Sequence, residues 1–324
     1  MRNADFEISS VAEVLRMFKE DRSFKDFRSF PVGTRAFGPV HRDLFGIWFR
    51  GQAEFGWHLV PSVFRPGAPE NEELAAWLFM LRAAEYRKDC HTQFDWLCLM
   101  RHYELPTRLL DWSENVLVAL YMACSEQVKE KEGALWILNV QRLNSQTRLG
   151  GDTAAVAVPS LCEVLFRAAM AIEATYPLFG DHIASLADRG IIHDMFRYRD
   201  LMKKFEEDPK RLAEELSSPV AVYPYRIGSR MIVQQSVFTL HGGREPNSRL
   251  EGVPSDILPP PVHLEELNDG LPSEQQFLRL GKITNKNAIL EELDQLGMTA
   301  STLFPELEYS SRDLKRKLRS REIT

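Results

Sequence analysis

The chain has 324 residues, of which 44% are apolar and 27% charged, and its formal net charge is −6. These values match those of soluble globular proteins and exclude wholesale disorder, a collagen-like fibre or a coiled coil. The longest apolar run, residues 116–124, is too short to span a bilayer, and the polar start MRNADFEISS lacks a signal-peptide core. We therefore expect a cytoplasmic protein with no membrane partner; the oligomeric state is left open.

Cysteine and histidine usage gives no indication of a metal site. The four cysteines lie on apolar or helical stretches without CxxC spacing, which favours reduced core thiols: Cys90, Cys98, Cys124 and Cys162. The eight histidines are scattered, and no HExxH motif occurs. We therefore expect no metal cofactor.

The first half of the chain alternates helices with strands. Ser10 and Glu13 form a capping-box pattern that predicts a helix up to about residue 20. Aromatic and branched residues predict a strand over 43–51. A helix over about 71–88 would place Leu74, Trp77, Leu78, Leu81 and Ala84 on one apolar face. Further helices are predicted over 92–103 and 115–130, followed by a strand over 133–140.

The second half predicts a helical insert and then a return to strands. Residues 141–218 are helical in pattern and more polar. Strands are predicted over 220–226, 230–242 and 276–284, with a Gly/Pro-rich loop over 242–263, a helix over 287–296 and a last basic helix. Without a regular βαβ alternation, this order predicts an α+β fold: a mixed or antiparallel central sheet flanked by helices.

The first polar constellation is Phe49-Arg50-Gly51-Gln52, at the end of a predicted strand. An arginine that follows apolar residues either snorkels outward or binds an anion. Gly51 would let a ligand or another backbone approach closely. An ordinary salt bridge at the strand end is the other interpretation of Arg50.

The second constellation covers residues 101–113, RHYELPTRLLDWS. Arg108 offers a planar fork for phosphate or carboxylate, His102 can exchange a proton near neutral pH, and Asp111 can hold an arginine in position. Further hydrogen-bonding groups come from Tyr103, Thr107 and Ser113. Such a density of polar groups favours a ligand site, while a buried Arg108–Asp111 pair is the structural alternative.

The third constellation is the pair Gln234-Gln235 in the predicted strand 230–242. Consecutive glutamines in an apolar strand put at least one amide on a covered face, where it needs partners. A solvated edge strand is the alternative interpretation.

Several of these blocks together resemble the FRG domain family. The blocks are FRGQ at 49–52, GWHLVPSVFR at 56–65, RHYELPTRLLDWSENVLVALYMA at 101–123, RMIVQQSVFTLHG at 230–242 and TLFPELE at 302–308. The resemblance runs from about Phe45 to Glu308, and it departs at Glu104 and Ser236, where the family usually has glycine. It divides the chain into an N-terminal helical segment 1–42, an FRG domain 43–308 with the insert at about 141–218, and a basic C-terminal helix or tail 309–324.

The order of motifs also resembles, more distantly, that of ADP-ribosyltransferases. This resemblance implies a split sheet, with Arg50 on the NAD pyrophosphate and the second constellation on the nicotinamide half. The third constellation, Gln234 and Gln235, would orient the ribose and act beside His102 and Tyr103 in catalysis. The resemblance also implies a carboxylate for the oxocarbenium-like transition state; the matching strand has glutamine there, and Glu274 is the substitute.

Two functions follow as hypotheses. The first is an NAD-dependent ADP-ribosyltransferase or NAD glycohydrolase-like enzyme, in the manner of a toxin or anti-phage defence effector, with Gly51, Thr107, Arg108, Asp111 and Ser113 binding NAD beside Arg50. The second is a non-catalytic module that binds a nucleotide or a nucleic acid. Six cations in the tail make it a candidate nucleic-acid contact: Arg312, Lys315, Arg316, Lys317, Arg319 and Arg321. A solvated helical face is the alternative for the tail.

Overall fold

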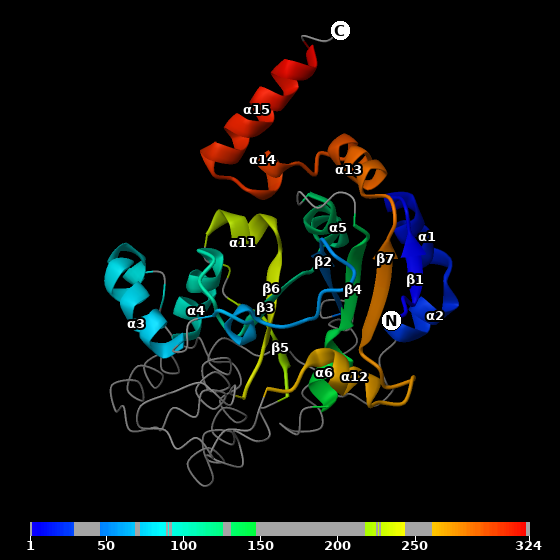
Figure 1. Ribbon diagram of the computed structural model, residues 1–324, viewed down its shortest axis with the longest axis horizontal. Helices are drawn as coiled ribbons and strands as arrows, with labels where there is room; N and C mark the ends of the chain where they lie inside the picture. Colours follow the sequence, from blue (N-terminus) through cyan, green and yellow to red (C-terminus); the bar gives the residue numbers. More distant parts are fainter. Residues whose placement is uncertain are drawn as a thin grey trace, which may run out of the picture.

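In the described part of the chain, the central sheet contains seven strands in the order β1-β7-β4-β2-β3-β6-β5 (Figure 1). The strands are β1 (Phe6–Ile8), β2 (Ile47–Gln52), β3 (Leu109–Ser113), β4 (Gly133–Asn139), β5 (Val220–Val222), β6 (Ser236–Leu240) and β7 (Leu278–Ile283). Only β1 and β7 pair in parallel among these strands. The computed structural model describes residues 2–28, 46–68, 72–88, 90, 93–125, 131–146, 218–224, 226, 228–243 and 261–321.

Helices cover the sheet on both faces and at its ends (Figure 1). They are α1 (Val11–Glu20), α2 (Arg22–Arg28), α3 (Glu72–Arg82), α4 (Gln93–His102), α5 (Val116–Ser125), α6 (Val140–Gln146), α11 (Ser229–Val233), α12 (Leu264–Asp269), α13 (Lys286–Gln295), α14 (Ala300–Leu303) and α15 (Leu307–Arg321). The described residues also include the short 3₁₀ helices η2 (Ser62–Phe64), between β2 and α3, and η3 (Ala84–Lys88), between α3 and α4. The α+β class with a mixed sheet is therefore confirmed.

The two faces of the sheet each have their own apolar core. Phe49 and Leu135 point to one face, where α1, α2, α5 and α13 pack. Trp48 and Trp136, their neighbours along the same strands, point to the other face, where α6 and α12 pack. Because successive strand residues alternate between faces, a strand covered on both sides is apolar throughout. All seven residues of β4 are buried for this reason.

Several local predictions are confirmed. The Ser10 hydroxyl accepts the Glu13 backbone N–H, and the Glu13 carboxylate accepts the Ser9 N–H at 2.6 Å, so the capping box starts α1. Helix α13 ends before Gly297, which has a φ of 76°. The buried thiols Cys90, Cys98 and Cys124 are reduced, and Cys162 lies outside the described residues.

The predicted strand over 230–242 is wrong in its first half. Residues 229–233 form the short helix α11, and Gln234 and Gln235 form a turn in which Gln235 has a φ of 48°. Only β6 is extended, and it pairs with β3 and β5. The helix buries Met231 and leaves Ile232 exposed. The apolar residues of this segment therefore do not fill the two covered faces of a strand.

The helix predicted over 71–88 also differs. Helix α3 ends at Arg82, and η3 continues the chain. The side predicted to be apolar core is exposed, with Trp77 at 57% and Leu81 at 53%. The side that α3 turns inward carries Glu72, which is buried, and Phe79, which packs edge-on against Trp96 of α4. Helix α6 begins the predicted insert, and residues 147–217 of that insert lie outside the described residues.

The sheet is narrowest between β2 and β3. These strands pair only at Phe49 and Ser113, whereas β2 pairs with β4 over six residue pairs and β3 with β6 over five. The described strands nevertheless form one sheet, so the ADP-ribosyltransferase-like split sheet is not confirmed. The N-terminal segment belongs to the same sheet, because β1 pairs with β7.

Candidate functional site

A pocket of about 980 Å³ lies along the narrow junction between β2 and β3. Its polar lining is predominantly basic. Among the described residues, the lining includes four arginines, three histidines and two carboxylates: Arg50, Arg65, Arg101, Arg230, His58, His102, His263, Glu104 and Asp111. Aromatic side chains, among them Trp57, Phe64, Phe304 and Tyr309, supply much of the remaining wall.

Arg50 extends from β2 across the junction to β3. Its Nη1 donates to the backbone oxygen of Asp111 at 2.7 Å and lies 3.7 Å from the Asp111 carboxylate. Its Nε is buried without a hydrogen-bond partner. Burial lowers the pKa of Arg50 to about 10; Asp111 opposes this effect, and the charges of Arg101 and Arg65 add to it. The guanidinium is still charged at neutral pH, and its side chain is 14% exposed at the wall of the pocket.

Asp111 holds a second arginine from another element. Arg101, near the end of α4, donates from Nε and Nη2 to Asp111 Oδ2 at 2.8 and 2.6 Å. Burial alone would raise the pKa of Asp111, but the charge and hydrogen bonds of Arg101, together with the charge of Arg50, hold it below its usual value. Asp111 is therefore an anion that orders two arginines.

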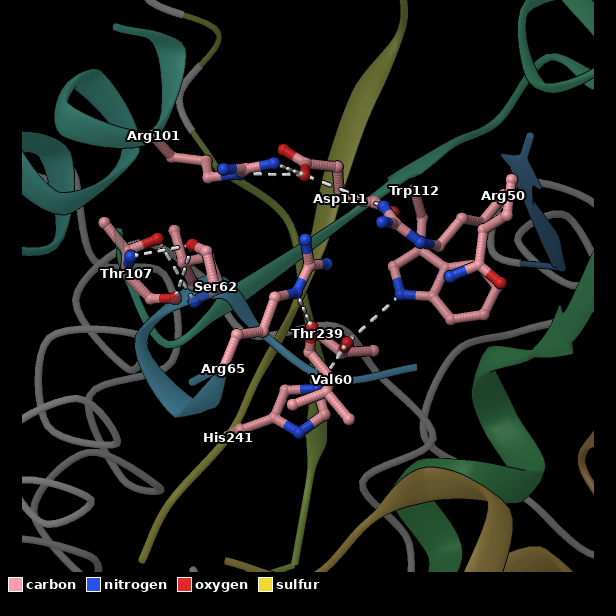
Figure 2. Close-up of polar contacts among 12 residues, drawn as sticks. Arg50, Val60, Ser62, Arg65, Arg101, Thr107, Asp111, Trp112, Thr239 and His241 are labelled. Atoms are coloured by element: carbon pink, nitrogen blue, oxygen red, sulfur yellow. Dashed lines mark hydrogen bonds and ion pairs between the residues drawn. The ribbon is translucent and has the colours of Figure 1, made fainter. Parts of the chain in front are cut away.

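Arg65 approaches the same point from a third segment, the turn after η2. Its Nε donates to the Val60 backbone oxygen at 2.9 Å. Burial, followed by the charge of Arg101, lowers the pKa of Arg65. Figure 2 shows Arg50, Arg65 and Arg101 reaching from three segments toward the region of Asp111. Three guanidinium groups and one carboxylate leave a local charge of about +2, which suits phosphate oxygens.

Six of the ten predicted site residues line the pocket, and four do not. The lining residues are Arg50, Gly51, His102, Asp111, Ser113 and Gln234. The others are Tyr103, Thr107, Arg108 and Gln235. Glu274, the substitute carboxylate, is also absent from the lining and lies in an exposed turn before β7.

Arg108 is buried and pairs with Glu72, whereas the structural alternative had paired it with Asp111. Its Nε donates to Glu72 Oε2 at 2.8 Å, and its Nη1 donates to the His241 backbone oxygen at 3.1 Å. The side chains of Arg108 and Glu72 are only 7% and 5% exposed. Residues three apart along an extended chain point to opposite faces, so Arg108 and Asp111 could not meet.

Gly51 serves the contact between β2 and α5. A Cβ atom added at Gly51 would lie 1.8 Å from the Ala119 backbone oxygen and 2.7 Å from the Ala123 nitrogen. The close approach is therefore made by another backbone, which is one of the two interpretations of this glycine. Gly51 still forms part of the pocket wall.

His102 and Tyr103 point to different surroundings. Burial, together with the charge of Arg230, lowers the pKa of His102, so its imidazole is neutral at pH 7. Tyr103 is exposed, and its hydroxyl lies 2.5 Å from that of Tyr86. This hydrogen bond, with a smaller effect of burial, raises the pKa of Tyr103 to about 12. Tyr103 is thus a neutral side chain beside the pocket.

The remaining predicted residues mainly connect segments. The Ser113 hydroxyl donates to the Gln234 backbone oxygen at 2.7 Å, and the Gln234 amide donates to the Leu303 oxygen at 3.1 Å. Thr107 is tied to Ser62 through its backbone. Glu104 has a φ of 63°, a conformation that favours glycine, which the family usually has at this position.

Sequence reasoning missed several residues of the pocket as ligand contacts: Arg65, Arg101, Arg230, Phe304 and Tyr309. A signal was present for Arg65, which ends the block GWHLVPSVFR. Arg101 stands in the second constellation beside His102. Arg230 and Phe304 lie 74 positions apart and meet only through the fold, so no local pattern could join them.

Membrane-spanning helices and metal-ligand clusters are both absent from the part of the chain that the structure describes. No helix there is long and apolar enough to span a membrane. The same residues contain no group of three or more histidine, cysteine, aspartate or glutamate side chains that could hold a metal ion.

The fold and the pocket define a mixed α+β protein with a basic cavity at a narrow strand junction. Residues 46–132 match the family model of the FRG domain, so the chain contains an FRG domain. The match includes Arg50, Arg65, Arg101 and Asp111, whereas Arg230, Phe304 and Tyr309 lie outside it. Neither a curated protein nor a solved structure matches the chain.

Proposed function

We propose that the protein binds the diphosphate of a nucleotide in this pocket and that NAD is its substrate, for ADP-ribosyl transfer or for hydrolysis to ADP-ribose. The convergence of Arg50, Arg65 and Arg101 near Asp111 is the observation that carries the proposal. A volume of about 980 Å³ lies at the upper end of the range for small-molecule sites and has room for a dinucleotide.

The charge balance of the cluster favours a diphosphate. Arg101 is neutralised by Asp111, whereas Arg50 contacts mainly a backbone oxygen and keeps its Nε unpaired. Arg65 has a backbone oxygen as its hydrogen-bond partner. Two guanidinium charges thus remain for a ligand, and a nucleotide diphosphate diester such as NAD carries two negative charges.

For NAD, the chemistry would break the bond between ribose C1′ and the nicotinamide nitrogen. Nicotinamide leaves with the bonding electrons, and water or an acceptor then supplies the new bond at C1′. The positive charge that develops on the ribose calls for a nearby anion. The described lining residues include two carboxylates, Glu104 and Asp111, of which Asp111 is engaged by two arginines.

A non-catalytic nucleotide-binding module is the second candidate. One observation in its favour is that Gln234 supplies an amide at the position where the ADP-ribosyltransferase motif order implies a carboxylate. Another is that the carboxylate of Asp111 is engaged in ion pairs with arginines. Both candidates predict the same contacts to phosphate. They differ in whether the carbon–nitrogen bond of NAD is broken.

Nicotinamide release from NAD by the purified protein tests the first candidate. A thermal shift with NAD measures binding in the same preparation. We expect both signals to be lost in Arg50→Ala and retained in Arg16→Ala, which removes an exposed arginine on α1. A thermal shift without nicotinamide release selects the binding module, and the absence of both rejects the proposal.

Consumption of NAD would suit a toxin or an anti-phage effector, and we extend the proposal to this setting. Expression of the active protein should then lower cellular NAD and slow growth. The Arg50→Ala variant, expressed at the same level, should leave both unchanged. Normal NAD levels in cells that express a protein active in vitro would contradict the extension.

The basic tail supports a separate proposal, that α15 contacts nucleic acid. Residues 312–321 contain six basic residues and one acidic residue, a net charge of +5 in a chain whose total is −6. Phosphate contacts make such binding strongly dependent on salt. Electrophoretic mobility shifts with single-stranded DNA and RNA at two salt concentrations would measure it, and no shift at low salt would refute it.

A further inference from the structure

The pocket has a second end, whose composition differs from that of the arginine cluster. It is formed by α11, the turn after α11, the segment that joins α14 to α15, and the start of α15. Arg230, Phe304 and Tyr309 line the pocket there, and each is partly exposed. His102 lies near this end, because the charge of Arg230 contributes to its lowered pKa.

These three side chains lie stacked around the Phe304 ring. The Arg230 guanidinium carbon lies 4.6 Å from the centre of the Phe304 ring, and the Tyr309 ring stacks on Phe304 at 4.5 Å with an angle of 20° between the planes. The hydrogen bond from the Gln234 amide to the Leu303 oxygen, 3.1 Å long, fixes α11 against α14. The stack is therefore held in place before any ligand arrives.

A preformed stack of this kind suits a flat ring. Guanidinium groups and tyrosine rings both stack on aromatic faces, and a nucleobase offers such a face. The charge of Arg230 favours a neutral ring as the ligand, because a cation is attracted to a neutral aromatic ring and repels a cationic one. NAD contains one ring of each kind, the neutral adenine and the cationic nicotinamide.

The two ends of the pocket also differ in their place along the chain. The family match covers residues 46–132 and includes the arginine cluster, whereas the stack comes from residues 230–309. Variants of the stack therefore leave the matched segment unchanged.

We infer that Arg230, Phe304 and Tyr309 form an adenine subsite, in which a neutral purine stacks against the guanidinium or phenol face of the stack. This inference rests on the proposed nucleotide-binding function and adds an orientation to it. The adenine end of the ligand points toward α14 and α15, the diphosphate lies at Arg50, Arg65 and Arg101, and the other ribose is directed toward the opposite end of the pocket.

Binding of three small probes separates the two ends. Inorganic pyrophosphate carries only the diphosphate, ADP-ribose adds adenine, and nicotinamide mononucleotide carries the cationic ring without adenine. The variants are Tyr309→Ala, which shortens the stack, and Arg230→Lys, which keeps the charge but removes the planar group. Tyr309→Phe is the matched control because it retains the ring, and Arg65→Ala reports on the phosphate end.

We expect at least one of the variants Tyr309→Ala and Arg230→Lys, the one at the face that adenine occupies, to weaken ADP-ribose about tenfold to a hundredfold. Both variants should leave pyrophosphate and nicotinamide mononucleotide within about twofold. Tyr309→Phe should bind all three probes like the unsubstituted protein. Arg65→Ala should weaken all three. Circular dichroism melts confirm that each variant is folded.

Three results would overturn the adenine subsite. They are unchanged ADP-ribose binding in both stack variants, an equal loss of pyrophosphate binding, and a loss confined to nicotinamide mononucleotide. In each of them the unsubstituted protein still binds its probes, so the proposed nucleotide-binding function survives. If the unsubstituted protein binds neither pyrophosphate nor ADP-ribose, the proposed function fails and the subsite fails with it.

Discussion

Arg108 and Glu72 are joined by two hydrogen bonds, because the same carboxylate accepts the Arg108 Nε at one oxygen and the Arg108 backbone N–H at the other, each at 2.8 Å. The first links two side chains, and the second fixes the start of β3 against α3. Both side chains are almost completely buried. Arg108 therefore belongs to the scaffold that supports the pocket, and Arg50 belongs to the pocket itself.

We expect Arg108→Ala to destabilise the protein by about 3–5 kcal/mol, because the Glu72 carboxylate would be left buried without its partner. Arg50→Ala should lower the melting temperature less than Arg108→Ala, because its ion pair with Asp111 is 3.7 Å long, and should abolish the thermal shift with NAD. Thermal melts of the two variants, with and without NAD, measure both effects. If Arg50→Ala unfolds the protein as severely as Arg108→Ala, Arg50 is a scaffold residue and the site assignment is wrong.

Gly51→Ala should destabilise the protein although it adds only a methyl group. The new Cβ would lie 1.8 Å from the Ala119 oxygen, so α5 or β2 must move. Overpacking of this kind typically costs about 1–3 kcal/mol. Gly46→Ala is the control, because a Cβ there meets nothing within 4 Å. Chemical denaturation of both variants tests the contact, and equal stabilities would contradict it.

The fold could be predicted where one local signal was sufficient. The strand β4 and the helix α1 follow from an apolar run and from a capping box. The boundary between α11 and β6 could not be predicted, because the turn requires a positive φ at Gln235 and a glutamine in the sequence does not indicate such a conformation. The exposed side of α3 could not be predicted either, because an apolar helical face does not reveal which of its sides the rest of the chain will cover.

The candidate site was predicted as a region and only partly as a set of contacts. Arg50 and Asp111 were found because they belong to polar constellations that interrupt otherwise apolar segments. Asp111 pairs with Arg101 and not with Arg108. This choice depends on the alternation of side chains along β3 and on where α4 ends, and the spacing of the residues in the sequence did not determine where α4 ends. The ring end was missed because Arg230 and Phe304 meet only in the folded chain.

Stability should depend on pH through His241, which is buried directly after the end of β6. Its Nε2 lies 2.9 Å from the Thr239 hydroxyl, which also accepts the Trp112 indole N–H (Figure 2). Burial, with smaller effects from neighbouring cations, lowers the pKa of His241 to about 3. The unfolded chain takes up a proton near pH 6.5 and the folded chain does not, so this histidine costs stability as the pH falls from about 6.5 toward 3.

His241→Asn should therefore reduce the loss of stability between pH 7 and pH 5 by about 2 kcal/mol, at about 1.4 kcal/mol per pH unit below 6.5. Urea denaturation of both proteins at the two pH values measures the difference. The comparison is between slopes, so any constant cost of the substitution cancels. Parallel pH dependences would mean that His241 is protonated in the folded protein.

Asp111→Asn tests whether Asp111 serves the fold at the expense of ligand affinity. In the native protein the carboxylate pairs with Arg101 and lies near Arg50, and its charge also repels an incoming phosphate. At a separation of about 6 Å and an effective dielectric constant of about 20, that repulsion is about 3 kcal/mol. The substitution also frees the Arg101 side chain, and ordering that side chain again on the ligand costs about 0.5–1.5 kcal/mol of binding free energy.

The repulsion exceeds this ordering cost, so the amide variant should bind pyrophosphate about tenfold more tightly while melting at a lower temperature. Glu7→Gln, which removes one negative charge from the edge strand β1, is the control and should change neither property. Weaker binding in Asp111→Asn would mean that the ordering of the arginines by Asp111 outweighs its charge.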